Sequence, residues 1–568
     1  MIDCGGGVVL QRGVRCTMSD GVVLVSDHYA PAAPSGRLPT ILMRQPYGRD
    51  IASTVVYAHP AWFARHGYHV VIQDVRGRGD SEGEFYPFLH EQRDGAETIA
   101  WLRTLPESNG RVGMYGFSYQ GMTQLLAAAA QPEGLMCIAP AMAAHDLYHG
   151  WFYQNGALRL ASSLGWGLQM LKEDARRRGL REASDGLERA WSALPAQLLE
   201  TPYGAHPAIH GECLPTYVKD WLEHDGPGEF WSRMDLSETV GQVLVPALHL
   251  SGWYDTYLKG TIDGFHAMTH GAGSELARAN QYLVAGPWVH IPWGARIGAM
   301  DFGAEAMLDT DALLLRWFNH WLKDSGEFAS EPKIRHFALH ANRWCDAEAW
   351  PGEAVMSLYL RSGGRANSSK GDGMLAGAAA TGDEAADLVV VDPEVPVIAP
   401  GGIVSASGCF NQAAMEQGNN VLVYTSTPLQ EELHVFGAPR VSVHVATSAA
   451  YADVVVKLVC VRANGDADFV SIGVARSGFL FGAEYAPDTV QLWEFEMEPT
   501  SWVFQPGERV RVEIAGGSYP LFDRNPGTDV KPRDASSWNW RRSTHGVYHD
   551  EKRASVIHLP LAAVPRIV

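Results

Sequence analysis

The sequence predicts an α/β fold followed by an all-β domain, and three observations lead to this prediction. In the first third of the 568 residues, short apolar runs alternate with helical patterns, which is typical of a mostly parallel sheet. Residues 145–240 carry helical patterns without strand runs. Beyond residue 350, short strand patterns separated by Gly, Pro and Asp replace nearly all helical patterns. A chain of this length also exceeds what one hydrophobic core usually supports.

The first third supplies most strands of the predicted sheet. Asp20 and Gly21 form a hairpin turn signal, so we expect the sheet to open with an antiparallel pair. Strands are expected at residues 22–25, 40–43, 69–73, 112–115 and 135–139. Helices are expected at residues 61–66, 91–105 and 119–130.

The middle of the chain predicts an inserted helical cap. Residues 157–177 and 184–199 have apolar positions three and four apart, as helices do. Strands resume at residues 243–250 and 281–285, each followed by a loop. A helical block between two strands of one sheet is most simply a cap that covers one edge of the sheet.

The last part of the chain predicts a jelly-roll β-sandwich. Strands are expected at residues 356–360, 387–391, 421–425, 440–446, 454–461, 490–497, 509–514 and 555–559. The predicted domain limits are 1–144 with 241–350 for the α/β domain, 145–240 for the cap, and 351–568 for the jelly roll.

Composition excludes several classes of partner. The formal net charge of -19 argues against nucleic acid, which needs clustered Lys and Arg. The seven cysteines form no CxxC pair and predict free thiols in a reducing compartment. No signal-peptide pattern and no apolar run of about 18 residues are present, so we expect a cytoplasmic protein without a membrane partner.

Cofactor and metal motifs are also missing from the sequence. Gly77-x-Gly79 lacks the third glycine that a dinucleotide site needs. The 22 histidines show no H-E-x-x-H or comparable spacing. We therefore predict no cofactor and no catalytic metal.

Residues 111–121 carry the candidate nucleophile, Ser118. A β run leads into Gly116-x-Ser118, and an Ala-rich helical run follows. A serine at such a turn is held in a strained backbone with its hydroxyl exposed above the sheet, beside the amide groups of a helix N-terminus. Gln120 stands where the second glycine of G-x-S-x-G belongs, and Gly121 comes one residue later.

Two later loops can supply the partners of a nucleophilic serine. An α/β-hydrolase places its acid and then its histidine after later strands. Residues 245–250 run into a loop that carries Asp255, and residues 281–285 run into a loop that carries His290. The order and the placement together predict a Ser118, Asp255 and His290 triad.

Several motifs resemble those of the cocaine esterase/X-prolyl dipeptidyl-peptidase family of α/β-hydrolases. The family's Gly-x-Ser-Tyr-x-Gly elbow is matched by residues 116–121, which accounts for the displaced glycine. Residues 74–83, 94–102, 286–290, 506–511 and 522–526 resemble further motifs along nearly the whole chain. The resemblance implies an α/β-hydrolase domain with an inserted cap and a C-terminal jelly roll.

The resemblance also implies roles for single residues. The Tyr47 hydroxyl and the backbone N–H of Tyr119 would form the oxyanion hole, the first because a neutral phenol can donate at pH 7. Trp151 and Trp166 look like the cap tryptophans that contact the acyl group, and Tyr257 takes an aromatic position after the triad aspartate. An aromatic pocket of this kind would favour bulky or aryl acyl groups.

Some departures separate relatives within the family. The α-amino-acid ester hydrolases bind a substrate ammonium with two acidic residues where this chain has Tyr257 and Leu258. The peptidase branch usually carries a longer N-terminal region. The prediction is therefore an ester hydrolase with a small-molecule acyl substrate.

Three questions stay open at this point. An amidase or X-prolyl dipeptidyl-peptidase with the same site is one alternative, and a catalytically inactive binding protein is another. A homo-oligomer is possible. Arg76, Asp80 and Glu82 are expected to form structural ion pairs near the site.

Overall fold

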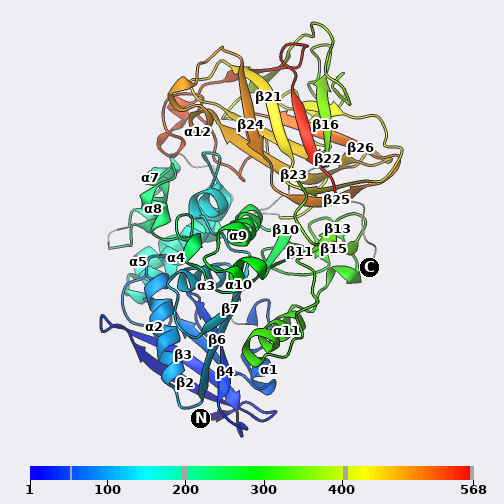
Figure 1. Cartoon of the computed structure of the whole chain (residues 1–568). Coiled ribbons are helices and arrows are strands. Elements are labelled where there is room, and N and C mark those ends of the chain that lie inside the picture. Colours follow the sequence, from blue (N-terminus) through cyan, green and yellow to red (C-terminus); the bar gives the residue numbers. More distant parts are fainter. Residues whose placement is uncertain (51–53, 195–201, 212, 353, 401–406, 563–568) are drawn as a thin grey trace.

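The computed structural model describes residues 1–50, 54–194, 202–211, 213–352, 354–400 and 407–562. Figure 1 shows an α/β part that holds the N-terminus, a β-rich part formed by the C-terminal residues, and a group of helices between them on one side. This arrangement agrees with the predicted fold class.

An eleven-stranded sheet forms the centre of the α/β part. Its order is β1-β2-β3-β5-β4-β6-β7-β10-β11-β14-β15, parallel from β5 to β14 and antiparallel at both ends. The strands are β1 (Ile2–Asp3), β2 (Val8–Thr17), β3 (Val23–Pro31), β4 (Leu38–Gln45), β5 (His69–Asp74), β6 (Ser108–Phe117), β7 (Leu135–Ala141), β10 (Ala247–Tyr254), β11 (Gln281–Val289), β14 (Ile334–Ala338) and β15 (Arg343–Ala347). The antiparallel β2–β3 pair confirms the predicted hairpin.

Helices cover both faces of this sheet because its strands are apolar on both sides. Leu42 and Val71 face a core shared with α2 (Glu91–Thr104), α3 (Tyr119–Ala129) and α9 (Leu258–Gly271). Their neighbours Ile41 and Val70 face a second core. This second core is shared with α1 (Pro60–Arg65) and α11 (Thr310–Lys323). Because successive side chains point to opposite faces of each strand, the sheet packs against a layer of helices on each face.

The cap contains the expected helices and one strand pair that was not expected. Its helices are α4 (Leu160–Arg177), α5 (Arg181–Ser192), α7 (Tyr217–Glu223), α8 (Glu229–Ser232) and the π-helix η2 (Tyr148–Phe152). β8 (Tyr153–Gln154) pairs with β9 (Ala157–Leu158), so the prediction of a strand-free block is wrong. Strands of two residues are too short to show a period-2 pattern. Residues 195–199 of the second predicted helix lie outside the described residues.

The C-terminal part is built around a second eleven-stranded sheet, with a separate β20–β25 pair. Its strands are β16 (Val355–Arg361), β17 (Met374–Ala376), β18 (Asp387–Val391), β19 (Leu422–Thr425), β20 (Leu433–Gly437), β21 (Arg440–Thr447), β22 (Asp453–Val461), β23 (Ala467–Arg476), β24 (Gln491–Glu496), β25 (Thr500–Phe504), β26 (Arg509–Ala515), β27 (Ser543–Tyr548) and β28 (Val556–Pro560). The eight predicted strands are present. The sequence prediction missed β17, β20, β23, β25 and β27.

The predicted domain limits fall between elements in two of three places. Residue 144 lies between β7 and η2, and residue 350 lies between β15 and β16. Residue 240 lies in the 3₁₀ turn Val240–Gln242 just before β10. We propose 1–144 with 241–350, 145–240 and 351–568 as the three units.

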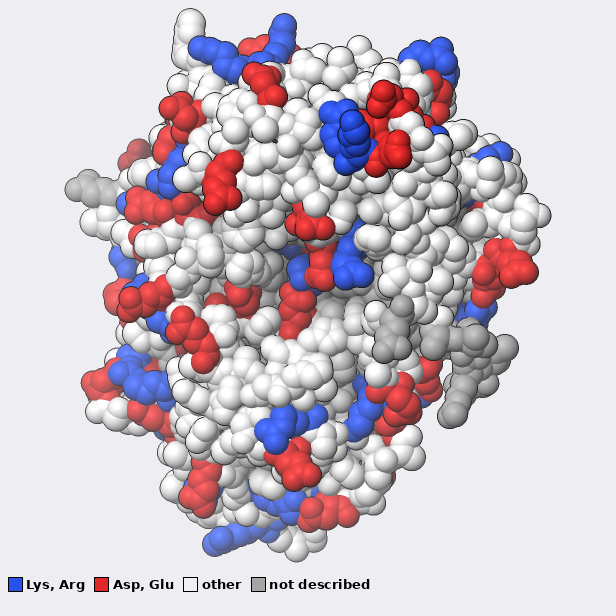
Figure 2. Space-filling model, turned by 45° about the horizontal axis from the view of Figure 1, so that its top comes forward, with Lys and Arg blue, Asp and Glu red and all other residues white. Residues whose placement is uncertain are grey.

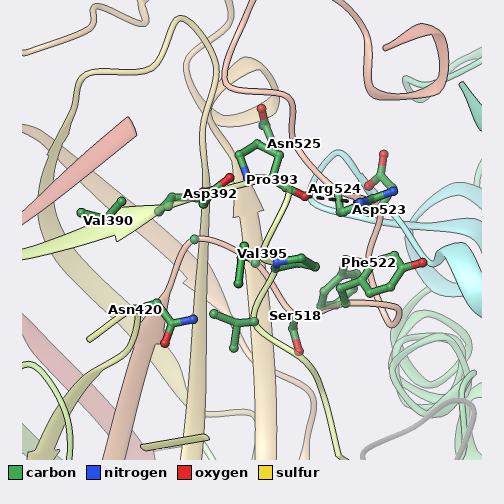
Figure 3. A pocket seen from close by; sticks show the side chains of 16 residues that line it. Val390, Asp392, Pro393, Val395, Asn420, Ser518, Phe522, Asp523, Arg524 and Asn525 are labelled. Carbon is green, nitrogen blue, oxygen red and sulfur yellow. Dashed lines mark hydrogen bonds between the residues drawn. The ribbon is translucent and has the colours of Figure 1, made fainter. Parts of the chain in front are cut away.

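Asp523 joins the β-rich part to the cap. Its carboxylate accepts hydrogen bonds of 2.9 Å from the amide of Leu158 and the hydroxyl of Tyr203, both in the cap. It also pairs with Arg476 at 2.9 Å, within the β-rich part. Close by, a cavity of about 30 Å³ lies next to Arg524, whose guanidinium donates to the carbonyl oxygen of Pro393 (Figure 3).

The structure shows how charged side chains are distributed on one face and that the cysteines are unpaired. On the face drawn in Figure 2, basic side chains lie in small groups beside acidic ones. All seven cysteines are described residues and carry free thiols. None of the helices in the described ranges has the length and apolar character that crossing a bilayer demands.

Candidate active site

Ser118 lies at a sharp turn between β6 and α3. Its backbone has φ 62° and ψ -128°, a region that non-glycine residues rarely adopt. Gly121 lets the helix pass β7, because a Cβ there would lie 2.7 Å from the Cβ of Ala143 and 2.9 Å from the carbonyl oxygen of Ala141. The close approach therefore falls at Gly121 rather than at Gln120, whose side chain accepts a 3.1 Å bond from the amide of Phe117.

Asp255 and His290 form a hydrogen-bonded pair after β10 and β11. The distance from His290 Nδ1 to Asp255 Oδ1 is 2.7 Å. Asp255 is fully buried, and its other oxygen accepts a 3.0 Å bond from the amide of Tyr257. The His290 side chain is 28% exposed, so solvent or substrate can reach the imidazole. The pairing fixes the ring and leaves Nε2 for chemistry.

Tyr47, Ser118 and His290 lie at the same edge of the sheet, since each follows the carboxyl end of a parallel strand. The Ser118 side chain is close enough to the Tyr47 hydroxyl to act on its pKa. Phe117, next to Ser118, has its ring centroid 5.4 Å from that of His290. The ring of Tyr257 lies 5.2 Å from His290 on another side.

The Tyr47 hydroxyl is held protonated by its surroundings. Burial raises the pKa of Tyr47 to about 12, although the side chains of Trp166 and Ser118 oppose the shift. Trp166 Nε1 donates to the Tyr47 oxygen at 3.2 Å. A phenol with this pKa is neutral at pH 7 and can donate to an oxyanion.

The backbone N–H of Tyr119 lies at the start of α3 next to Ser118, and its side chain is buried in the core. It is the first residue of α3, and in the described chain its amide N–H has no hydrogen-bond acceptor. Its hydroxyl donates to Glu91 at 2.8 Å and accepts from the amide of Phe88 at 3.0 Å. Glu91 pairs in turn with Arg44 at 2.7 Å, and all three side chains are buried. This network holds the first turn of α3 from behind.

Aromatic rings line the cap side of the site. Trp151 stacks on Tyr257 with centroids 3.7 Å apart, and both residues are nearly inaccessible. Trp166 stacks on Trp221 at 5.2 Å and lies 5.7 Å from Trp151. The three residues predicted for the acyl site are therefore neighbours.

Sequence reasoning missed Phe88 and Glu91. Phe88 has φ 70°, stacks on Tyr119 at 4.8 Å and meets Trp151 edge-on at 5.3 Å. The sequence predicts Glu91 only as the first residue of a helix. The signal that could have found it is a glutamate on the apolar face of the predicted helix, where a charge needs a partner.

Arg76, Asp80 and Glu82, in the segment 74–83, form the ion pairs that the sequence predicts. Arg76 binds Asp94 through two bonds of 2.8 Å. Asp80 pairs with Arg49 at 2.8 Å, and Glu82 pairs with Arg15 at 2.8 Å. In the same loop, buried Arg78 pairs with Asp174 of the cap helix α4 at 2.7 Å. Among the described residues, the groups that could hold a metal ion do not include Ser118, Asp255 or His290.

Comparison with known proteins covers both parts of the chain. The sequence model of the X-Pro dipeptidyl-peptidase (S15 family) matches residues 20–292, and that of the X-Pro dipeptidyl-peptidase C-terminal non-catalytic domain matches residues 326–558. The chain is 32% identical over 554 residues to the cocaine esterase of Rhodococcus sp. (strain MB1 Bresler), with 93% of this chain and 94% of the esterase covered.

Solved structures show the same fold. An aminopeptidase from a marine sediment Thaumarchaeota archaeon superposes with a TM-score of 0.81 at 23% identity, covering 98% of this chain and 97% of its own. An α-amino acid ester hydrolase superposes with a TM-score of 0.78 at 24% identity, covering 99% and 98%.

The fold and these matches define a serine hydrolase of the α/β-hydrolase class, with a non-catalytic β-rich domain at its C-terminal end. The chain belongs to the cocaine esterase/X-Pro dipeptidyl-peptidase (S15) family.

Proposed function

We propose that this enzyme hydrolyses carboxylic esters through an acyl-enzyme on Ser118. The observation that carries the proposal is the 2.7 Å hydrogen bond between His290 and buried Asp255, at the sheet edge that also holds Ser118 and Tyr47. Asp255 orients His290 as the base, and Tyr47 is a neutral hydrogen-bond donor beside the nucleophile Ser118. The similarity to a cocaine esterase supports an ester as the substrate.

The chemistry follows from these roles. His290 Nε2 accepts the Ser118 proton as Oγ attacks the carbonyl carbon, while Asp255 stabilises the imidazolium that forms. The Tyr47 hydroxyl and the Tyr119 amide donate to the oxyanion. His290 then protonates the leaving alcohol, and water attacks the acyl-enzyme with the same base to release the acid.

The aromatic shell favours an apolar acyl group. Trp166 contacts Tyr47, the ring of Tyr257 lies 5.2 Å from His290, and Trp151 packs against both aromatic residues. Leu258 is buried at the start of α9, so the two positions after Thr256 offer no carboxylate to a substrate ammonium. We therefore propose neutral esters with bulky or aryl acyl groups. The free thiols favour a reducing compartment, and the cytoplasm stays our prediction.

Labelling and turnover test the proposal together. A fluorophosphonate probe should label the wild-type chain on Ser118, and Ser118→Ala should abolish both the adduct and turnover of an aryl ester above background. Ser192→Ala, on the exposed cap surface, is the matched control and should behave as wild type. A wild-type chain that is neither labelled nor active would favour an inactive binding protein.

Matched substrates separate the esterase from an amidase. An aryl ester and the anilide with the same acyl group should be compared, with an X-prolyl anilide as a third substrate. We expect the ester to have the highest kcat/KM. Faster cleavage of the X-prolyl anilide would assign the chain to the peptidase branch.

A further inference from the structure

His28, His69 and Glu107 form a cluster at the opposite end of the sheet from the proposed active site. His28 lies within β3, and His69 is the first residue of the neighbouring strand β5. Glu107 immediately precedes β6. One ligand atom from each of the three residues lies within 4.8 Å of the others. Ser118 follows the carboxyl end of β6, so the length of that strand separates the cluster from it.

The two imidazoles have the spacing of ligands that share one ion. His28 Nδ1 and His69 Nε2 are 3.1 Å apart. An ion about 2.0–2.1 Å from both nitrogens, as Zn²⁺ is, would have an N–Zn–N angle of about 100°, which is near tetrahedral. The ring centroids are 4.9 Å apart with the ring planes at 60°. At the same distance between nitrogens, two rings that pointed straight at each other would have their centroids farther apart. The axes of the two rings are therefore inclined to the line that joins the nitrogens.

The other nitrogen of each ring is held by a hydroxyl. His28 Nε2 lies 2.9 Å from Ser26 Oγ, and His69 Nδ1 lies 3.3 Å from Thr40 Oγ1. Ser26 Oγ also donates to the carbonyl oxygen of Val14 at 3.3 Å, so it accepts from His28 Nε2–H and leaves Nδ1 as a bare acceptor. Metal-binding histidines are oriented by such bonds on their outer nitrogen.

One hydrogen bond joins the two facing ring nitrogens. The single proton between the facing nitrogens is the one an ion would replace. Glu107 is accessible to solvent and contributes a carboxylate oxygen to the cluster. Two nitrogens and one carboxylate are a donor set that suits Zn²⁺ and its neighbours rather than Ca²⁺ or Mg²⁺.

We propose that His28, His69 and Glu107 bind one divalent first-row transition ion, such as Zn²⁺, with water in the remaining position. The site ties the β3–β5 pair to the turn before β6 and has no part in ester hydrolysis. Metal binding therefore stabilises the fold while leaving the chemistry at Ser118 unchanged.

Calorimetry on tag-free, chelator-treated full-length protein tests the proposal. Zn²⁺ should bind with one equivalent per chain, raise Tm by a few degrees and leave ester turnover unchanged. Mg²⁺ at the same concentration should do neither. Glu107→Gln, a solvent-accessible change, should weaken Zn²⁺ binding at least about tenfold. Co²⁺ should give visible d–d bands in the wild type that are lost in His28→Gln.

A competing histidine pair supplies the matched control. His266 and His270 lie one turn apart on α9 with ring centroids 6.5 Å apart, and His270 is exposed. His270→Gln should keep the one-equivalent site and the Co²⁺ spectrum. Loss of the bound Zn²⁺ in His270→Gln, or undiminished binding in Glu107→Gln, would overturn the proposal. Absence of stoichiometric binding to the wild type would overturn it as well, and ester turnover confirms that each variant is folded.

Discussion

Trp166 on the cap helix α4 donates a 3.2 Å hydrogen bond from Nε1 to the hydroxyl oxygen of Tyr47, which follows β4 of the central sheet. The Ser118 side chain lies close to the same hydroxyl and acts on its pKa. The cap therefore touches the proposed oxyanion donor directly. An oxygen that accepts one hydrogen bond is polarised into a stronger donor, because bonds in a chain reinforce one another.

Trp166→Phe tests this link between the cap and the oxyanion hole. The variant keeps a ring to pack on Trp221 but loses the indole N–H. We expect kcat for an aryl ester to fall several-fold, about 1 kcal/mol, which is typical of one hydrogen bond. KM should change less, because the ring is retained. Trp191→Phe, at an exposed cap position, is the control and should leave kcat unchanged; a wild-type kcat in Trp166→Phe would show that the bond does not assist catalysis.

Tyr47→Phe removes the donor itself. Loss of one oxyanion donor typically lowers turnover by about 10²–10³. We expect kcat to fall by this factor while labelling of Ser118 by a fluorophosphonate slows without disappearing. Steady-state kinetics on an aryl ester provide the measurement. A rate within twofold of wild type would remove Tyr47 from the site.

Tyr119→Phe separates the side chain of this residue from its backbone role. The change leaves a buried Glu91 oxygen and the Phe88 amide without their partner, and each unsatisfied group costs about 1–3 kcal/mol. We expect a clear drop in the urea midpoint, with ester turnover at low urea within a few-fold of wild type, because the amide remains. Tyr451→Phe, at an exposed position, is the control. An unchanged midpoint would contradict the network described here.

His549 makes the stability of the β-rich part depend on pH. Its buried imidazole bonds Glu384 at 2.8 Å and Asp387 at 2.9 Å. Burial opposes the charged form, but the two carboxylates outweigh it and raise the pKa of His549 above its usual 6.5. The stabilisation is thus complete below pH 6.5 and is lost as pH rises through the higher folded-state pKa, with a slope of up to about 1.4 kcal/mol per pH unit.

Thermal midpoints between pH 5.5 and 9 check this dependence. The wild type should lose stability across the upper part of that range, and His549→Gln should lose this component while being less stable at pH 6. His270→Gln, at an exposed position, should follow the wild-type curve. A His549→Gln curve parallel to wild type would assign the pH dependence to other groups.

Strand and helix patterns predicted most strands of the central sheet and the helices α1, α2 and α3, because these elements bury apolar faces. They did not predict β1, β14 and β15 or the helices α9 and α11. The missed strand β23 has nine consecutive buried residues, so it lacks the alternation that marks a half-buried strand. β25 is buried along its whole length and has five residues. The β8–β9 pair fell below the length at which periodicity can be recognised.

The strand patterns that precede Ser118, Asp255 and His290 were enough to predict that all three residues follow strands of one sheet. The bond from Trp166 to Tyr47 was not predictable, since it joins residues 119 positions apart in different units. The same holds for Arg78 with Asp174, which are 96 positions apart. Contacts of this kind depend on how the cap lies on the sheet, which local patterns do not encode.

The carboxylate of Asp523 has a consequence for how such enzymes can be rebuilt. Since it satisfies the backbone of Leu158 and the hydroxyl of Tyr203, a chimera that exchanges the C-terminal domain alone would leave cap groups without an acceptor. Recombination within the family should therefore transfer the cap and the C-terminal domain from the same parent.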